Sequence, residues 1–305
     1  MSGTPFISLL PPGRVYGYKA GVPHDQQSTD VPSVFKDAMS VRETVFVEEQ
    51  KCPLEHEFDA DDPRSCHWVV YASVKTTKEP EQRDPVTNAI IRPRRSEAIS
   101  MPIGTLRLVP FPHTPHPVDG GRYVGNVLQH SDDHNGVGNG NGAKNGNGKI
   151  DHNIHRGGLG DIMTQPPFED LRRTFPLSYG PDRATEFHDG KEPYVKIGRV
   201  AVLPQFRGHQ IAVQLWNAAR KWLLENPTYF NPSVRELGLE RMKVGDSHDI
   251  PKWNGLVCVH AQESVVKVYE RWGFRVDKGM GKWYEEGIPH VGMFLRLEVN
   301  TEPQI

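Results

Sequence analysis

The turn at residues 207–212 carries the groups of this sequence best suited to bind an anion. It follows residues 195–202, whose β-branched content is typical of a buried strand, and it opens an amphipathic helix that begins near Ile211. The first amides of a helix lack carbonyl partners and carry a partial positive charge. We therefore expect a diphosphate site formed by Arg207, Gly208, His209, Gln210, Ile211 and Ala212. An ordinary turn with a solvated arginine explains the segment equally well.

A cluster of carboxylates forms the second group of candidate residues. Its members are Glu48, Glu49, Glu55, Glu57, Asp59, Asp61 and Asp62. Most of them are expected in a solvated loop, because charged side chains are seldom buried.

Alternating strands and helices must position these groups. Strands are expected at residues 14–20, 67–74, 102–110, 195–202, 256–261 and 290–299, and helices at 33–49, 211–222 and 264–272. Shorter helices are expected near 166–175 and 234–242. Pro204 ends the central strand, and Gly198 marks a bulge within it, because glycine inside a strand weakens regular pairing. Gly273 is typical of a left-handed helix stop.

Length and composition limit the classes of protein and of partner. The chain has 305 residues and a formal net charge of −2, with 36 Lys and Arg against 38 Asp and Glu, so it lacks the basic surface that nucleic acid or an anionic membrane requires. Its three cysteines have no metal-site spacing, and its histidine-rich tract lacks fixed geometry, so no metal is expected. No signal peptide or membrane span is evident, which favours a cytoplasmic protein, with the nucleus as the alternative.

Polar insertions interrupt what we interpret as a single domain over residues 1–305. Inserted loops are expected at about 75–101, 111–190 and 226–255. Within the second, residues 129–160 form a Gly/Asn/His tract that is expected to be disordered, because it has too little apolar surface to offset the entropy of ordering.

The segment at residues 195–222 resembles motif A of the GCN5-related N-acetyltransferases, the GNAT superfamily. In that family an Arg/Gln-x-x-Gly-x-Gly/Ala turn wraps the pyrophosphate of acetyl-CoA, and Gln210 stands here where the family usually has its first glycine. Residues 41–53, 59–62, 260–274 and 284–293 resemble the ElaA-type branch, which also tends to lack that glycine. These blocks occur in the expected order along the chain.

The resemblance implies an α/β (α+β) fold, with a mixed central sheet splayed between its fourth and fifth strands, helices on both faces and long inserted loops. The pantetheine arm of acetyl-CoA is then expected to insert at the splay and to pair with the backbone of Val200, Ala201 and Val202. The diphosphate is expected at residues 207–212, and no metal takes part.

Catalytic candidates follow from the same resemblance. Tyr269 matches the family tyrosine that protonates the departing thiolate, although a packed core aromatic is the alternative. His260 is a candidate base, although a lone strand histidine is more often a hydrogen-bonded structural residue, and Glu49 and Glu263 are the carboxylate candidates. Proximity with a water chain could replace a base. Acceptor contacts are expected from Arg42, Glu48 and Glu263.

The function indicated is acetyl-CoA-dependent N-acetylation of a primary amine on a small molecule, such as an amino sugar or a polyamine, by direct attack in a ternary complex. Protein lysine or amino-terminal acetylation is one alternative, and a non-catalytic CoA-binding regulatory module is another. Acyl-homoserine lactone synthesis shares the fold, but the later blocks match it less well. The expected partners are acetyl-CoA and the amine, and a homodimer is left open.

Overall fold

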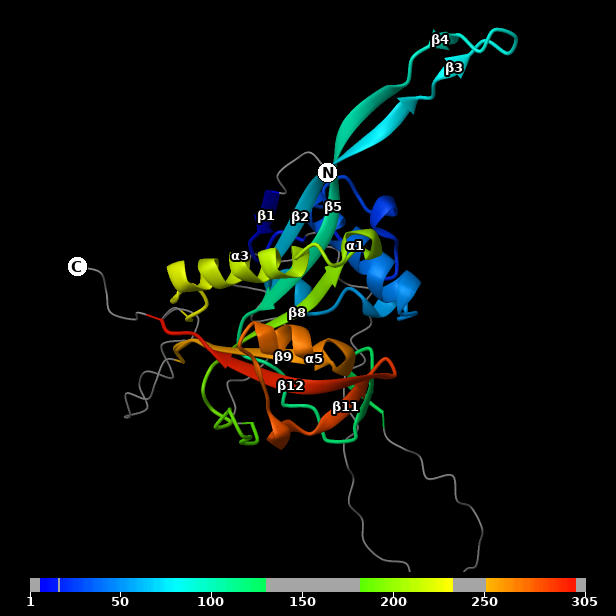
Figure 1. Cartoon of the computed structure of the whole chain (residues 1–305). Coiled ribbons are helices and arrows are strands. Elements are labelled where there is room, and N and C mark those ends of the chain that lie inside the picture. The colour runs from blue at the N-terminus through cyan, green and yellow to red at the C-terminus, as the bar shows by residue number, and fades with distance from the viewer. Residues whose placement is uncertain (1–5, 16, 130–181, 233–250, 300–305) are drawn as a thin grey trace, which may run out of the picture.

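The computed structural model describes residues 6–15, 17–129, 182–232 and 251–299 (Figure 1). Its strands are β1 (Phe6–Leu10), β2 (Cys66–Glu79), β3 (Gln82–Arg83), β4 (Ile90–Arg92), β5 (Arg95–Val109), β6 (Arg122–Val124), β7 (Val127–Leu128), β8 (Val195–Val202), β9 (Leu256–Gln262), β10 (Arg275–Val276), β11 (Lys282–Glu285) and β12 (Ile288–Arg296). Its α-helices are α1 (Ser33–Arg42), α3 (Ile211–Glu225) and α5 (Val266–Arg271). Single turns of 3-10 helix are η1 (His24–Gln26), η3 (Leu54–His56), η4 (Asp62–Arg64), η6 (Pro204–Phe206), η7 (Glu263–Val265) and η8 (Lys278–Met280).

A single large mixed sheet runs through the molecule in the order β1-β2-β5-β8-β9-β12-β11-β6-β7. Most neighbours are antiparallel, whereas β8 pairs with β9, and β11 with β6, in parallel. The β8–β9 pairing joins Val195–Ile197 to Val257–Val259 and then stops, although both strands continue. The predicted splay between the fourth and fifth strands of the sheet is confirmed.

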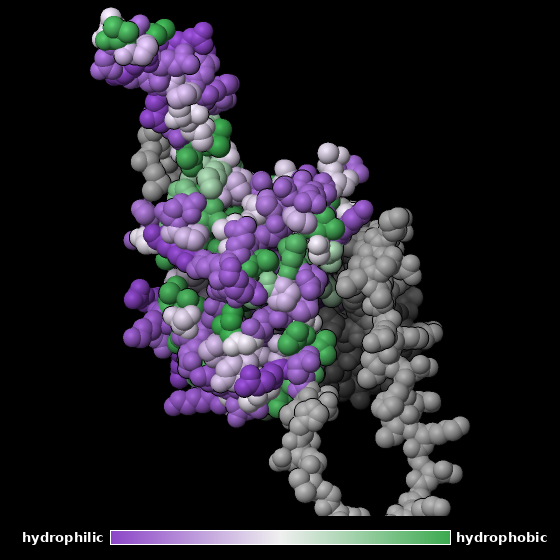
Figure 2. All heavy atoms as spheres, turned by 90° about the vertical axis from the view of Figure 1, so that its right-hand side faces the viewer, coloured by the Kyte–Doolittle hydropathy of each residue, from purple (hydrophilic) through white to green (hydrophobic). Residues whose placement is uncertain are grey.

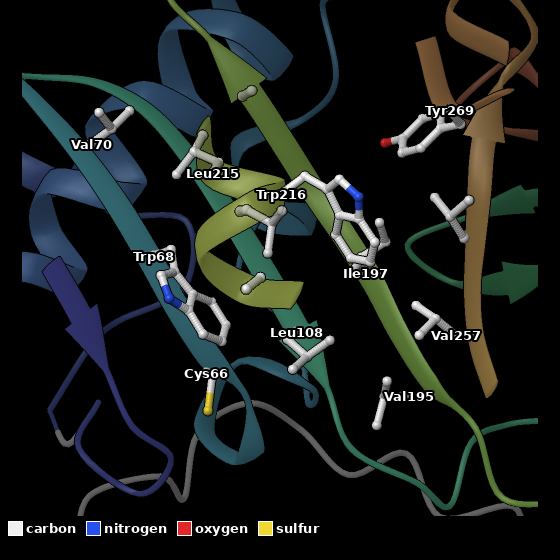
Figure 3. Close-up of a cluster of buried hydrophobic side chains, with 14 of the residues drawn as sticks. Cys66, Trp68, Val70, Leu108, Val195, Ile197, Leu215, Trp216, Val257 and Tyr269 are labelled. Carbon is white, nitrogen blue, oxygen red and sulfur yellow. The ribbon is translucent and has the colours of Figure 1, made fainter. Parts of the chain in front are cut away.

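Helices cover both faces of this sheet. Alternate β2 residues point to opposite sides: Trp68 packs edge-on against Trp222 of α3, whereas Val69 clusters with Ala38 of α1. The α3 face holds the larger core, to which β2, β5, β8 and β9 all contribute (Figure 3). Trp216 of α3 stacks on Trp272 beside α5, at 6.0 Å between ring centroids, so α5 covers the same face as α3. Each fully buried side chain of this kind stabilises the fold by about 2 kcal/mol.

A bulge lies in β8 next to the splay. Thr105 of β5 faces Ala201, and Arg107 faces Gly198, so one β5 residue stands opposite both Arg199 and Val200. Arg199 takes the extra position with a φ of 48°. The bulge predicted at Gly198 is therefore present, with the strained residue immediately after the glycine.

The first long helix ends in a different form from the one predicted. An α-helix spans Ser33–Arg42, and the chain then continues as the π-helix η2 (Glu43–Glu49). Wider hydrogen bonds, such as Gln50 N to Val45 O at 3.2 Å, mark the change. A π-helical turn is uncommon and often occurs at functional sites, and this one leads directly to Glu49.

The first strand is misplaced in the sequence prediction. Residues 14–20 were expected to be extended, yet the strand is β1 (Phe6–Leu10), which pairs antiparallel with β2. The apolar run at 6–10 supplies the strand, and Pro11 follows it at once. Val15 and Tyr18 are instead buried anchors of an irregular segment beside α1.

The inserted segments differ in structure. Residues 75–101 extend β2 and β5 into a long two-stranded arm that ends in β3 and β4 (Figure 1). The arm is mostly hydrophilic with an apolar tip (Figure 2), where Val86 is 91% exposed. It is exposed as predicted, but it is an ordered hairpin and not a loop.

The other two insertions are partly incorporated into the folded body. Residues 122–128 form β6 and β7 and extend the sheet beyond β11, and Phe230 and Trp253 are buried in the core. The tract at 129–160, apart from Gln129, and the helices predicted at 166–175 and 234–242, lie outside the described residues. That residues 1–305 form one domain stays a prediction. Within the described ranges no helix has the length and apolarity needed to cross a membrane.

Candidate functional site

The turn between β8 and α3 presents a run of free backbone donors. Among the described residues, the amides of residues 208–213 donate no hydrogen bond that would close the helix start, and the first such bond is Gln214 N to Gln210 O at 3.0 Å. No side chain caps α3. Six consecutive donors at the positive end of a long helix form a nest with the chemistry to hold a diphosphate.

Two residues of this turn have left-handed backbone. Gly208 has a φ of +79°, and a side chain added there would enter open space, so its backbone is exposed to an incoming ligand. Gln210 has a φ of 60°. Although Gln210 departs from the glycine of the family pattern, its backbone keeps the conformation that glycine adopts most easily.

Arg207 is held by Glu49 from the end of η2. The two guanidinium NH groups of Arg207 donate to the two carboxylate oxygens of Glu49, at 2.7 and 2.5 Å, and Nε donates to the carbonyl of Val202. This hydrogen bonding keeps the pKa of Glu49 below its usual range. A carboxylate paired in this way is a weak base, so the geometry favours a counter-ion role for Glu49 over the catalytic role expected from the sequence.

A one-sided strand connects this turn to the splay. Beyond Ile197, β8 pairs with β5 through Ala201 and Val202, and it has no partner on the β9 side within the described ranges. The segment from Gly198 to Leu203 is about 17 Å long at the usual rise of a strand, comparable with an extended pantetheine arm. Val200, Ala201 and Val202 lie in this segment, and their pairing with such an arm stays a prediction.

Tyr269 lies on α5 near the apex of the splay. Its side chain is 7% exposed and packs edge-on against Trp272 and Phe274. In Figure 3 its hydroxyl points away from β9 and toward β8. Burial raises the pKa of Tyr269, so the phenol stays protonated at neutral pH and can serve as a proton donor.

His260 lies on the other face of the sheet. It is the first β9 residue after the last β8–β9 pair, Ile197 with Val259. Its neighbours Val259 and Ala261 belong to the core under α5, so alternation places the His260 ring on the face of Cys258 and Trp283. Burial lowers the pKa of His260, and its ring is therefore mostly neutral near pH 7, as a base must be.

The acid and base candidates therefore flank the apex of the splay from opposite sides. A thioester held between β8 and β9 could meet Tyr269 on one face and an incoming amine beside His260 on the other. A separate base and acid suit acyl transfer, because the attacking nitrogen must lose protons while the leaving sulfur gains one.

Arg42 does not lie where a substrate could reach it. Its side chain is 1% exposed and donates to the carboxylates of Glu57 and Asp62, at 2.6 and 2.7 Å. Arg107 joins the same network through Asp59 and Asp62. The prediction that Arg42 binds substrate is wrong in this structure, because its guanidinium is buried and fully engaged.

The carboxylates of the 48–62 segment were also expected to be mostly solvated, and here the structure differs. Buried arginines on β5 and α1 form ion pairs with Glu57 and Asp62, so these two acids are buried counter-ions and are not solvated. Glu48 is exposed as expected. Glu263 is also exposed, and it is paired with Lys282 at 2.8 Å. An open hollow of about 290 Å³ lies beside Glu263, lined by Ser264, Ile288 and Pro289.

Two residues of the site were not identified from the sequence. Glu285 contacts His260, and Arg199 at the bulge donates to Asp59 at 3.0 Å. Glu285 lies inside the block at 284–293, but only the pairing of β11 with β12 brings it beside β9. No group of three or more His, Cys, Asp or Glu side chains suited to a metal occurs in the part of the chain that the structure describes.

Comparisons with known proteins give structural neighbours only. No family model matches the chain, and no curated protein matches it. The chain is similar to the crystal structure of Escherichia coli ElaA, with 15% identity over 95% of this chain and 99% of that one and a TM-score of 0.39. It is also similar to an acyl-CoA N-acyltransferase from Pseudomonas aeruginosa, with 16% identity over 95% and 99% and a TM-score of 0.37.

Likenesses at this level say nothing of substrate or chemistry, so the fold is identified from the topology of the chain itself. The strand order, the bulge in β8, the parallel pair that parts after Ile197 and Val259, and the helices on both faces are all present. The chain has the GCN5-related N-acetyltransferase fold that its sequence predicted.

Proposed function

We propose that the protein is an acetyl-CoA-dependent N-acetyltransferase that acetylates a primary amine of a small molecule. The observation that carries the proposal is the placement of His260 and Tyr269 on opposite faces where β8 and β9 part. The free amides of residues 208–213 lie at the far end of the same strand edge and suit the diphosphate of CoA.

The proposed reaction is direct transfer within one ternary complex. His260 Nε2 accepts a proton from the ammonium of the acceptor, and the neutral nitrogen attacks the thioester carbonyl. The C–N bond forms and the C–S bond breaks. Tyr269 gives its hydroxyl proton to the departing thiolate, and the second proton lost by the attacking nitrogen restores the Tyr269 hydroxyl through solvent. The products are an amide and free CoA thiol, and His260 releases its proton to solvent. Glu49 takes no part in these proton transfers and remains the counter-ion of Arg207.

The interpretation as an enzyme has a direct test. Purified protein is incubated with acetyl-CoA and a panel of amino sugars, polyamines and peptides, and thiol release is measured. At least one small amine should give turnover above background hydrolysis. Gly208→Pro is the matched negative, because proline cannot adopt a φ of +79° and its ring removes an amide donor, whereas Gly208→Ala keeps that donor. Acetylation of peptides alone would favour the protein acetyltransferase, and CoA binding without any turnover would favour the regulatory module.

We also propose a cytoplasmic or nuclear location. All three cysteines, Cys52, Cys66 and Cys258, are free thiols, and two of them are buried in the core. Free thiols are typical of a reducing compartment.

A further inference from the structure

Glu285, the last residue of β11, holds its carboxylate between three nitrogen-bearing side chains. Its Oε1 lies 3.3 Å from Nδ1 of His260 and accepts a hydrogen bond from Nε1 of Trp283 at 2.7 Å. Its Oε2 lies 3.9 Å from Nε2 of His290. The side chain is 30% exposed, so this carboxylate is partly open to solvent and not sealed within the core.

The chemistry of these partners fixes the hydrogen on His260. An ionised carboxylate can only accept hydrogen bonds, and the indole nitrogen of Trp283 can only donate. Nδ1 of His260 must therefore carry the hydrogen that points to Glu285. In a neutral imidazole the other nitrogen, Nε2, then has a free lone pair. Glu285 relates to His260 as the carboxylate of a hydrolase triad relates to its histidine, whose tautomer and orientation it fixes.

The free lone pair on Nε2 of His260 lies where a base for the proposed reaction is needed. Within the described residues Nε2 of His260 has no hydrogen-bond partner. This nitrogen is not a buried unsatisfied atom, and the side chain is 19% exposed. His260 follows the last β8–β9 pair, so this nitrogen is carried on the residue next to the apex of the splay. His290 is different, since its Nδ1 donates to the carbonyl of Ile288 and it lies one strand further away.

We propose that Glu285 is a positioning residue that holds His260 in the Nδ1–H tautomer and stabilises the imidazolium formed when Nε2 takes the proton of the acceptor amine. This inference rests on the proposed acetyltransferase function. Trp283 supports the arrangement by fixing Oε1 with its indole N–H, and its ring packs edge-on against the His260 ring at 4.9 Å.

Other charged or titratable groups also face His260, and they act against Glu285. Burial lowers the pKa of His260 most, and Lys196 and His290 lower it further, whereas Glu285 raises it. The groups that act on it from neighbouring elements are Glu285, Lys196, His290 and His116. Removing the negative charge of Glu285 should therefore leave only influences that disfavour the imidazolium.

The test combines nitrogen-15 NMR of the full chain with pH–rate profiles. The ring nitrogens of the 14 histidines are labelled, and the His260 pair is assigned as the signal lost in His260→Gln. Glu285→Gln keeps an oxygen acceptor for Trp283 but removes the charge, and Glu285→Ala removes both. Glu286→Gln is the matched control, because that neighbouring carboxylate binds His56 and the amide of Gly125 and does not contact His260.

The wild type should show the Nδ1–H tautomer at His260, and Glu285→Ala should lose that preference. Glu285→Gln should lower the His260 pKa, and the acid limb of kcat/KM should move down by about one pH unit, with the KM for acetyl-CoA unchanged. Glu286→Gln should move neither. If Glu285→Gln does not fold by thermal melt, Glu285→Asp tests the same limb, and it should retain the tautomer.

An Nε2–H tautomer in the wild type, or a His260 pKa that Glu285→Gln leaves in place, overturns the proposal whether or not the protein turns over. An acid limb that stays fixed while the tautomer changes also overturns it, because Glu285 would then be structural. A complete lack of turnover on every acceptor defeats the proposed function instead, and the NMR result would still decide how Glu285 holds His260.

Discussion

The carboxylate of Glu49 forms a bidentate ion pair with the guanidinium of Arg207, with both oxygens accepting hydrogen bonds, at 2.7 and 2.5 Å. Both side chains are more than 40% exposed, so the pair is worth at most about 1 kcal/mol. The Glu49 carboxylate nevertheless neutralises Arg207, the cationic side chain of the turn proposed to bind the diphosphate. Binding of an anion at this turn must compete with a resident carboxylate.

Glu49→Gln should tighten donor binding. The substitution removes the competing charge and leaves Arg207 free for the diphosphate, so the Kd for CoA should fall by up to about fivefold. Turnover at saturating donor should stay unchanged. Calorimetry with CoA and steady-state rates measure the two effects, with Glu48→Gln as a neighbouring control. A large loss of turnover would restore Glu49 to the catalytic role that the sequence suggested.

Tyr269→Phe should separate chemistry from packing. The ring remains in its contacts with Trp272 and Phe274, while the proton for the thiolate is lost. Turnover should fall by roughly tenfold to a thousandfold with stability and CoA affinity retained. Tyr269→Ala, the control for packing, should lose about 3 kcal/mol or more of stability. Full activity in the Phe variant, measured at saturating acetyl-CoA, would remove Tyr269 from the mechanism.

Gln210→Gly should be tolerated and slightly stabilising. A left-handed conformation costs a non-glycine residue about 1–2 kcal/mol, and glycine avoids this cost but loses some conformational entropy on folding. The free energy of unfolding should therefore rise by up to about 1 kcal/mol, with CoA affinity preserved. Gln210→Val should do the reverse, since a β-branched residue fits this φ poorly. Chemical denaturation of both variants checks the order, and a less stable Gly variant would show that the Gln210 side chain contributes more than its backbone costs.

His67 should make the fold sensitive to mild acid. Burial lowers the pKa of His67 from its usual 6.5 to about 4, so between these values the unfolded chain binds a proton that the folded one does not. Stability should therefore fall as the pH drops from 7 to 4.5, by about 2 kcal/mol from this residue. His67→Gln, which keeps a donor for the carbonyl of Asp62, should flatten that slope. Urea unfolding at several pH values measures it, and equal slopes would exclude His67 as the cause.

Local patterns in the sequence predicted the elements that bear the site. The strand Val195–Val202 and the helix from Ile211 have the predicted positions, because β-branched content, Pro204 and an apolar stripe define them without help from distant residues. The helix start after residues 207–210 is also where the sequence indicated it, and the binding of a diphosphate there stays a prediction. The misplaced first strand shows the limit, since residues 6–10 are extended only because β2 is available to pair with them.

The roles of single charged residues could not be predicted in this way. Arg42 and Glu49 lie in one helical segment and were both expected to act at the site. Arg42, at the end of α1, is buried, whereas Glu49, at the end of the π-helix η2, is exposed. Glu285 and His260 are far apart in the chain and meet only through the register of β11, β12 and β9. Such meetings are properties of the folded sheet, which no local pattern encodes.

The short parallel pairing between β8 and β9 is also a weak junction between the two halves of the sheet. Three residue pairs join the two halves there, whereas seven pairs join β9 to β12 and four join β12 to β11. Native-state hydrogen exchange should therefore resolve β9, β12 and β11 as one cooperative unit that opens below the cost of global unfolding. The stacking of Trp216 of α3 on Trp272 beside α5 is an apolar contact between the helices that cover the two halves. The splay thus also marks a line along which the two halves of the sheet are expected to separate before the whole chain unfolds.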